Sequence, residues 1–186
     1  MDMQEVFRAT EEKMQKSVQG LLNEYAAIRA GRANPAILER VRVDYYGVET
    51  PVNQMAAVSV PDARTLLITP WDKTTLKAIE KAIQTSDIGI NPQNDGSVIR
   101  LVFPPLTEER RRELGKSVRK TGEDFKVTVR GVRREALEKL KAMKKNGEIT
   151  EDDLANGEKK TQTLTDKYCK ELDDAAVAKE KEIMEL

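Results

Sequence analysis

The sequence contains no histidine and a single cysteine, Cys169, in 186 residues. Without histidine, a Ser-His-Asp triad, a Cys-His pair and an imidazole metal ligand are all impossible, and one thiol cannot build a cysteine-rich zinc site. One cysteine also excludes an intramolecular disulfide and suits a reducing compartment. We therefore expect a cytoplasmic protein that has none of these catalytic or metal sites and holds no cofactor.

Aromatic residues and long apolar runs are also scarce. Only 4% of the residues are aromatic, so base stacking is a poor prospect for this chain. No stretch approaches the roughly 18 apolar residues of a membrane span, and the charged N-terminal segment lacks the apolar core of a signal peptide. We therefore expect no membrane-spanning or targeting segment. Charged residues make up 34% of the chain, which favours long helices with a large exposed surface.

The net charge of zero conceals an uneven distribution along the chain. Residues 107–145 hold 14 basic and 7 acidic groups, whereas residues 146–186 hold 6 basic and 12 acidic groups. One strongly basic segment therefore precedes a strongly acidic one. Such an asymmetry indicates a polyanion partner more strongly than the average charge does.

Three segments have the apolar spacing of long helices, at residues 2–29, 107–145 and 150–184. Each stripe needs a partner to bury it, and short loops make neighbouring helices antiparallel, so we predict a rod-shaped, antiparallel three-helix bundle. The predicted buried stripes are Met14, Val18, Leu21, Tyr25 and Ile28; Leu114, Val118, Phe125, Val132, Ala136, Leu140 and Met143; and Leu164, Tyr168, Leu172, Ala175 and Ile183.

Residue types at the predicted helix ends support these boundaries. Gly31 is predicted to stop the first helix, and Asn146-Gly147 to stop the second. Thr107 is the predicted N-cap of the second helix. Thr150 with Asp153 three residues later forms a variant of the capping box at the start of the third.

Residues between the first two helices have the alternating pattern of strands and hairpins. A short helix is predicted at 73–85, with Asp72 as its cap. The predicted strands are 41–45, 57–60, 65–68, 88–90 and 98–103. The sequence therefore predicts an α+β protein.

Two domains follow from these elements. Residues 1–30 and 106–186 form the predicted bundle, and residues 31–105 form an inserted small α/β domain. The chain crosses between them twice, so a two-stranded hinge is expected. The predicted hinge residues are Gly31, Arg32, Ala33, Pro104 and Pro105.

On a helical wheel, five basic residues of the second helix share an arc of about 60°, separate from its apolar and acidic arcs. They are Arg112, Arg119, Lys126, Arg130 and Arg133. The presence of many charges by itself needs no partner, because a solvated helix face would explain it. The separation by sign, and the four arginines with their planar guanidinium groups, favour contact with an RNA backbone.

Other candidate sites have simpler interpretations. The acidic third helix either pairs with the basic face, repels nucleic acid or is simply solvated, and we favour the last. Asp152 and Asp153 suit the start of a helix better than a metal site. Asn94-Asp95-Gly96 is a turn, no glycine-rich nucleotide loop occurs, and Cys169 has no base to activate it.

Several strings in the chain closely resemble the bacterial ribosome recycling factor family. They are IRAGRANP at 28–35, YYG at 45–47, IEKAI at 79–83 with SD at 86–87, GINP at 89–92, PPLTEERR at 104–111, and VRR at 132–134 followed by Ala136. They span nearly the whole chain in order. The strings IRAGRANP and PPLTEERR are together highly specific for this family.

The resemblance implies an L-shaped protein of tRNA-like dimensions that binds the 70S ribosome after termination. With elongation factor G and GTP, such a factor splits the ribosome into subunits and releases mRNA and tRNA. Its bundle contacts large-subunit ribosomal RNA, and elongation factor G acts on its second domain. The resemblance assigns RNA contacts to Arg130 and Arg133, and more weakly to Arg29 and Arg32.

Two glycines are departures that we expect to weaken the helices. Gly131 stands where the family commonly has asparagine, and Gly157 lies within the third helix. We predict a monomeric, non-enzymatic translation factor that acts by shape and charge. A helical adaptor that binds a protein partner is the alternative, and an unknown enzyme ranks last.

Overall fold

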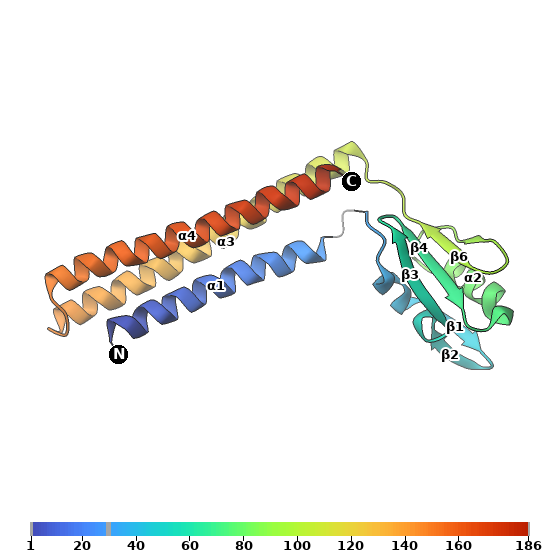
Figure 1. The fold of residues 1–186 in the computed structure, drawn as a ribbon, viewed down its shortest axis with the longest axis horizontal. Helices are drawn as coiled ribbons and strands as arrows, with labels where there is room; N and C mark the ends of the chain where they lie inside the picture. Colours follow the sequence, from blue (N-terminus) through green and yellow to red (C-terminus); the bar gives the residue numbers. More distant parts are fainter. Residues whose placement is uncertain (1, 29–30, 186) are drawn as a thin grey trace. The chain divides into compact units, whose positions relative to one another are not determined.

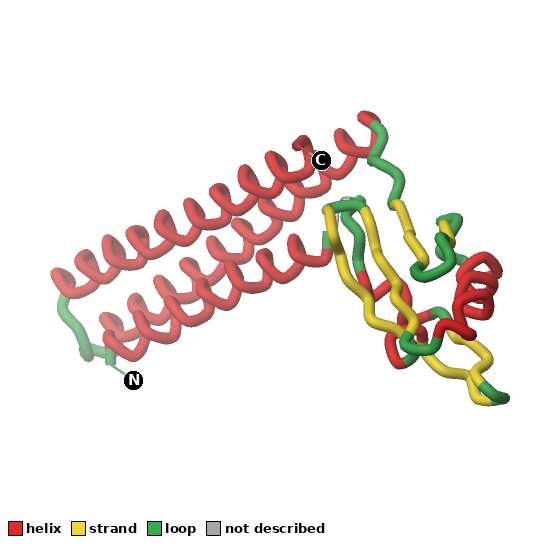
Figure 2. The backbone as a smooth tube through the Cα atoms, turned by 45° about the vertical axis from the view of Figure 1, so that its right-hand side comes forward, coloured by secondary structure: helices red, strands yellow, loops and turns green. Residues whose placement is uncertain are grey.

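The computed structural model describes residues 2–28 and 31–185. The described residues divide into two compact units. Residues 2–28 and 108–185 form one, here called the helical unit, and residues 31–107 form the other, here called the α/β unit. Figure 2 shows that all the strands belong to the α/β unit.

The helical unit consists of α1 (Met3–Ala27), α3 (Glu108–Lys145) and α4 (Glu151–Glu185). α1 begins with a capping box, in which the Asp2 carboxylate accepts from the Glu5 amide and the Glu5 carboxylate accepts from the Asp2 amide, both at 2.8 Å. The prediction that Gly31 stops this helix is wrong, because Ile28 is already its C-cap.

The predicted turn between the other two helices is confirmed. Gly147 has a φ of +74°, a conformation that glycine adopts without steric cost. The Gly147 amide donates to the Lys144 carbonyl and the Glu148 amide to the Met143 carbonyl, which satisfies two terminal carbonyls of α3. The Thr150–Asp153 capping box forms as predicted, at 3.0 and 3.1 Å.

The three helices pack against one another, with α3 antiparallel to both α1 and α4 (Figure 1). Fully buried side chains come from all three helices and include Met14, Leu21, Leu140 and Leu172. Seven of the predicted stripe residues are only half-buried: Val18, Ile28, Leu114, Phe125, Val132, Leu164 and Ala175. The interior of the bundle is therefore narrower than the apolar pattern predicts.

Glycines allow the helices to approach closely. A Cβ placed on Gly157 would lie 2.9 Å from Cδ1 of Leu140 and 3.2 Å from Cε of Met3. A Cβ on Gly122 would lie 3.1 Å from the Tyr25 hydroxyl. Gly157, which we expected to weaken the helix, also has a packing role, because its missing side chain leaves room for Leu140 of α3 and Met3 of α1.

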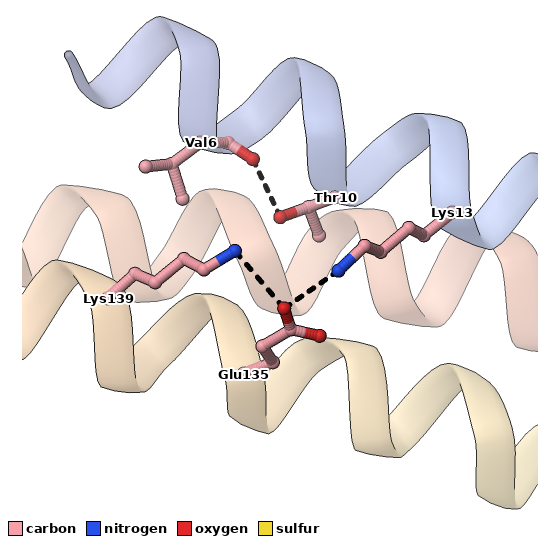
Figure 3. Close-up of polar contacts among 5 residues, drawn as sticks. All are labelled: Val6, Thr10, Lys13, Glu135 and Lys139. Carbon is pink, nitrogen blue, oxygen red and sulfur yellow. Dashed lines mark hydrogen bonds and ion pairs between the residues drawn. The ribbon is translucent and has the colours of Figure 1, made fainter. Parts of the chain in front are cut away.

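Polar groups also join the helices. The Tyr25 hydroxyl donates to the Val118 carbonyl at 2.7 Å in the interior. At the surface, the Glu135 carboxylate accepts from Lys13 of α1 at 2.7 Å and lies 3.1 Å from Lys139, one turn along α3 (Figure 3). These two ammonium groups hold the pKa of Glu135 below its usual value. The charged contacts supplement an interior that is apolar for most of its length.

The α/β unit contains α2 (Leu76–Thr85) and six strands. The strands are β1 (Arg42–Tyr45), β2 (Val48–Pro51), β3 (Ala56–Asp62), β4 (Thr65–Pro70), β5 (Gln93–Asn94) and β6 (Ile99–Val102). β1 and β2 form an antiparallel hairpin, whose turn at Tyr46-Gly47 has φ values of +50° and +82°. The other strands form an antiparallel sheet in the order β3-β4-β6-β5.

One apolar core holds this unit together, with contributions from the strands, α2 and a 3-10 helix at Pro35–Arg40. Its fully buried members are Leu38, Val52, Leu66, Ile68, Ile79, Ile99 and Leu101. Asp72 caps the start of a 3-10 turn that leads into α2, as predicted, by accepting from the Thr74 amide at 3.0 Å. The predicted strand at 88–90 is wrong, because the short strand forms at Gln93–Asn94.

Both chain segments that enter and leave the α/β unit bond to the turn between β3 and β4. The Ala33 amide donates to the Ala63 carbonyl at 2.8 Å, and the Phe103 amide donates to the Arg64 carbonyl at 2.7 Å. Ala33 and Phe103 are also buried in the core. The entry and exit of this unit are thus fixed side by side.

Candidate nucleic-acid interface

α3 holds the five predicted cations, Arg112, Arg119, Lys126, Arg130 and Arg133, along one side of an uninterrupted helix. The helix continues through Gly131, where an added Cβ would meet no atom within 4 Å. The expected local weakness at Gly131 therefore does not interrupt the helix that presents these residues. We call the five residues the basic stripe.

Lys126 lies at the middle of the basic stripe, and 13% of its side chain is exposed, against 64% for Arg119 and 70% for Arg112. Its ammonium group lies 2.6 Å from Glu123 of the same helix and 2.8 Å from Asp173 of α4. The hydrogen bond to Asp173, and to a smaller extent the one to Glu123, raises the pKa of Lys126. The side chain is charged, but two carboxylates neutralise it.

Arg119 and Arg112 also have carboxylate partners. Nε of Arg119 lies 3.0 Å from Glu180 of α4, and a guanidinium nitrogen of Arg112 lies 2.7 Å from Glu108, one turn earlier in α3. The acidic helix is therefore not simply solvated beside the stripe, contrary to our preferred interpretation of its sequence. Asp173 and Glu180 pair with the basic face of α3.

The C-terminal end of the stripe differs. Arg130 is exposed, and no carboxylate of the described residues lies within ion-pair distance of its guanidinium group. Arg133 is half-buried and donates to the neutral Gln162 side chain at 3.2 Å. That amide in turn donates to Asp166 at 2.8 Å. Neither guanidinium group forms an ion pair with a carboxylate of the described residues.

Further cations widen this surface beyond the predicted arc. Lys116, Lys120, Arg134 and Lys141 are all exposed on α3. By helical geometry, Arg134 follows Arg130 by one turn on the same side. The wheel missed it because Arg134 lies about 40° beyond Arg130, outside the arc that defined the stripe.

Arg29 lies outside the described residues, so its predicted contact has no structural counterpart here. Arg32 is exposed and belongs to the α/β unit, not to the basic stripe. Pro104 and Pro105 are exposed, and Gly31 has a φ of +82°. The other predicted hinge residue, Ala33, is instead buried in the core of the α/β unit, as described above.

Cys169 is half-buried on α4 and close enough to the stripe to feel its charge. Burial raises the pKa of its thiol, and the positive charges of Arg130 and Lys126 oppose that shift. A raised pKa disfavours the thiolate, which is the reactive form of cysteine. This environment is that of a structural thiol.

The acidic start of α4 is explained by helix formation. Asp153 bonds the Thr150 amide, and the hydrogen bonds with Thr150 hold the pKa of Asp153 below its usual value. Over residues 2–28 and 31–185, no group of histidine, cysteine or acidic side chains has the arrangement of a metal site. In the same ranges, no helix is both long and apolar enough to cross a membrane.

Two aromatic side chains of the α/β unit are largely exposed. Tyr46 is 81% exposed at the tip of the β1–β2 hairpin, and Trp71 is 69% exposed after β4. Trp71 and Tyr45 line the same shallow pocket.

Fold and site define a class of two-unit α+β proteins in which an α/β insertion interrupts a three-helix bundle with a basic face. A model of the ribosome recycling factor family matches residues 21–184. The chain belongs to the ribosome recycling factor family. The family resemblance and the predicted fold class, with helical terminal regions around a small sheet-containing unit, are thereby confirmed.

Relatives match almost from end to end. The chain is 62% identical to the ribosome-recycling factor of Acetivibrio thermocellus over 180 residues, which cover 97% of this chain and 98% of that protein. It is 57% identical to the ribosome-recycling factor of Geobacillus kaustophilus, with 98% of each chain covered.

Two solved structures are also similar. A solution structure of the ribosome recycling factor has a TM-score of 0.65 and 41% identity, covering 100% of this chain and 99% of that one. The T. thermophilus ribosome recycling factor, described in models with E. coli elongation factor G bound to the E. coli post-termination complex, has a TM-score of 0.55 and 45% identity. It covers 98% of this chain and 99% of its own.

Proposed function

We propose that this protein binds the post-termination ribosome and, with elongation factor G and GTP, splits it into subunits, releasing mRNA and tRNA. End-to-end similarity to ribosome recycling factors supports this proposal, as does the relative described with elongation factor G on the post-termination complex. In this role the protein is a non-enzymatic translation factor. The GTP is hydrolysed by its partner.

The bundle is proposed to contact large-subunit ribosomal RNA through α3. The observation that supports this assignment is the pair Arg130 and Arg133, which have no carboxylate partner among the described residues. Arginine engages phosphate oxygens through two parallel hydrogen bonds, so exposed and uncompensated arginines suit an RNA backbone. Arg112, Arg119 and Lys126 contribute less, because carboxylates already neutralise them.

A hinge between the units would let force on one unit move the other. We place it before Ala33 and after Phe103, because both residues are bonded into the α/β unit. Gly31, Arg32, Pro104 and Pro105 then remain as hinge residues. A crosslink that locks the two units together should slow subunit splitting, and full activity in the locked protein would remove the hinge from the mechanism.

Alanine substitutions at Arg130 and Arg133 test the RNA contact. Loss of two phosphate contacts should weaken binding to isolated large subunits by at least about tenfold and slow subunit splitting with elongation factor G and GTP. Because both residues lie outside the buried stripe, thermal unfolding should barely change. Lys170→Ala is the matched control, since it removes an exposed cation from α4.

Unchanged affinity of the Arg130→Ala/Arg133→Ala variant for large subunits would refute the contact. Salt dependence separates RNA binding from the alternative, an adaptor that binds a protein partner. Contacts with several phosphates predict a steep loss of affinity between about 50 and about 200 mM salt. An apolar protein interface would respond weakly to salt.

A further inference from the structure

Carboxylates occupy one half of the basic stripe. The Lys126 ammonium lies between Glu123 at 2.6 Å and Asp173 at 2.8 Å, and Nε of Arg119 lies 3.0 Å from Glu180. Two of these three carboxylates come from α4, a helix that packs along α3. A phosphate group that approached these cations would meet oxygen atoms already in place.

These carboxylates line an open groove between α3 and α4. Gly122 lies in the groove beside Arg119, and Val177 on the opposite wall is 68% exposed. The Glu180 side chain is 32% exposed and that of Asp173 is 56% exposed, so solvent reaches both ion pairs. The Arg119–Glu180 pair is solvent-exposed, and exposed ion pairs add little to folding stability. The carboxylates of both pairs do, however, cancel the positive charge of Arg119 and Lys126 in the groove.

The contrast with the other end of the stripe is sharp. Arg130 has no carboxylate within ion-pair distance among the described residues, and Arg133 bonds a neutral amide. Both ends belong to one continuous helix, and both hold arginines. The difference in available charge is therefore made by the facing residues of α4 and by Glu123.

We propose that Glu123, Asp173 and Glu180 act as built-in competitors for phosphate, which confine RNA binding to the Arg130–Arg133 end of the stripe. This inference rests on the proposed function. A cation held by a carboxylate displaces few counterions from the RNA, because it cannot neutralise a phosphate until that carboxylate has moved away. Lys126 and Arg119 therefore add little affinity, and the orientation of the helix on RNA is set by the unpaired arginines.

Charge-neutral, isosteric variants test the proposal. Glu123→Gln/Asp173→Asn frees Lys126, and Glu180→Gln frees Arg119. Affinity for isolated large subunits should rise in each variant by about threefold at low salt. The slope of log affinity against log salt should become steeper by about 0.7–0.9 for each cation that gains a phosphate.

Matched controls separate local release of a cation from the overall change in charge. Asp174→Asn and Glu158→Gln neutralise exposed carboxylates of α4 that have no ion-pair partner among the described residues. Combined, they change net charge by as much as Glu123→Gln/Asp173→Asn does. Adding Lys126→Ala to that double variant should remove its gain in affinity.

Three outcomes overturn the inference. The competitor variants could bind no more tightly than the controls, could show an unchanged salt slope, or could lose melting temperature without gaining affinity, as a purely structural role would produce. Failure of the proposed function looks different. In that case Arg130→Ala/Arg133→Ala would bind large subunits as the unsubstituted protein does, whatever the competitor variants do.

Discussion

The helical unit and the α/β unit bury their apolar residues in different ways. The α/β unit surrounds one compact cluster of large aliphatic side chains from strands, α2 and a 3-10 helix. The helical unit spreads its buried residues along three helices, where glycines such as Gly157 bring neighbouring helices close. A long bundle therefore depends on close approach at many separate points, whereas the α/β unit depends on one filled interior.

Truncation in each core should have the largest effect and should stay within its own unit. Leu140 and Ile68 are each 0% exposed, so Leu140→Ala and Ile68→Ala should each cost about 3 kcal/mol of unfolding free energy. Hydrogen exchange measured by mass spectrometry would localise the loss. Leu140→Ala should accelerate exchange in α3 and α4, and Ile68→Ala in β4 and β6.

Each of these variants is the control for the other. If Leu140→Ala accelerated exchange in the sheet as strongly as in the helices, the two units would unfold together. Their description as separately stabilised units would then be wrong.

Substitution of a buried and of an exposed helix glycine should change the free energy of unfolding in opposite directions. Gly157→Leu forces a side chain against Leu140 and Met3 and should cost about 2 kcal/mol. Gly131→Ala meets no neighbour within 4 Å and should stabilise α3 by about 0.5–1 kcal/mol, because alanine favours helix more than glycine. Urea unfolding of both variants checks the opposite signs. Equal effects would show that packing at Gly157 is loose.

The pH dependence of stability tests Tyr25, whose buried hydroxyl joins α1 to α3. Burial, with smaller contributions from Glu180 and Glu24, raises its pKa to about 12. Since the folded state holds this proton more tightly than the unfolded chain, its contribution is complete below about pH 10 and is lost as pH rises toward about 12.

We expect that loss to amount to roughly 2–3 kcal/mol. Tyr25→Phe, which has no proton to lose, serves as the reference. The difference in unfolding free energy between the two proteins, followed by urea unfolding from pH 8 upward, should shrink above pH 10. A difference that stays constant to pH 12 would contradict the assignment.

Much of the fold was predictable from local patterns. The capping box at Thr150 and Asp153 and the turn at Gly147 involve residues close in sequence, so their spacing identifies them. Gly31 was misassigned, because the pattern offers a favourable stop but does not show where packing against α3 and α4 ends. The strand predicted at 88–90 failed for a similar reason, since pairing with β6 decides which residues form the edge strand.

The basic stripe was predicted as a set of residues but not as a set of available charges. Helical periodicity places Arg119, Lys126, Arg130 and Arg133 on one side of α3. It contains no information about the facing helix, whose Asp173 and Glu180 lie roughly 50 residues further along the chain. The exposure of Arg134 was missed because the wheel has no reference for how deeply neighbouring helices cover the stripe.

By itself, the sequence determined the helical and strand-forming segments, the family, and the separation of basic from acidic residues. These depend on residue types at short spacings and on strings that similar proteins share. Tertiary structure alone decided that Gly157 is a packing site and that Lys126 and Arg119 are paired with carboxylates. The physical reason is that contact energies act between atoms a few ångströms apart, and only the folded chain brings such distant residues within that range.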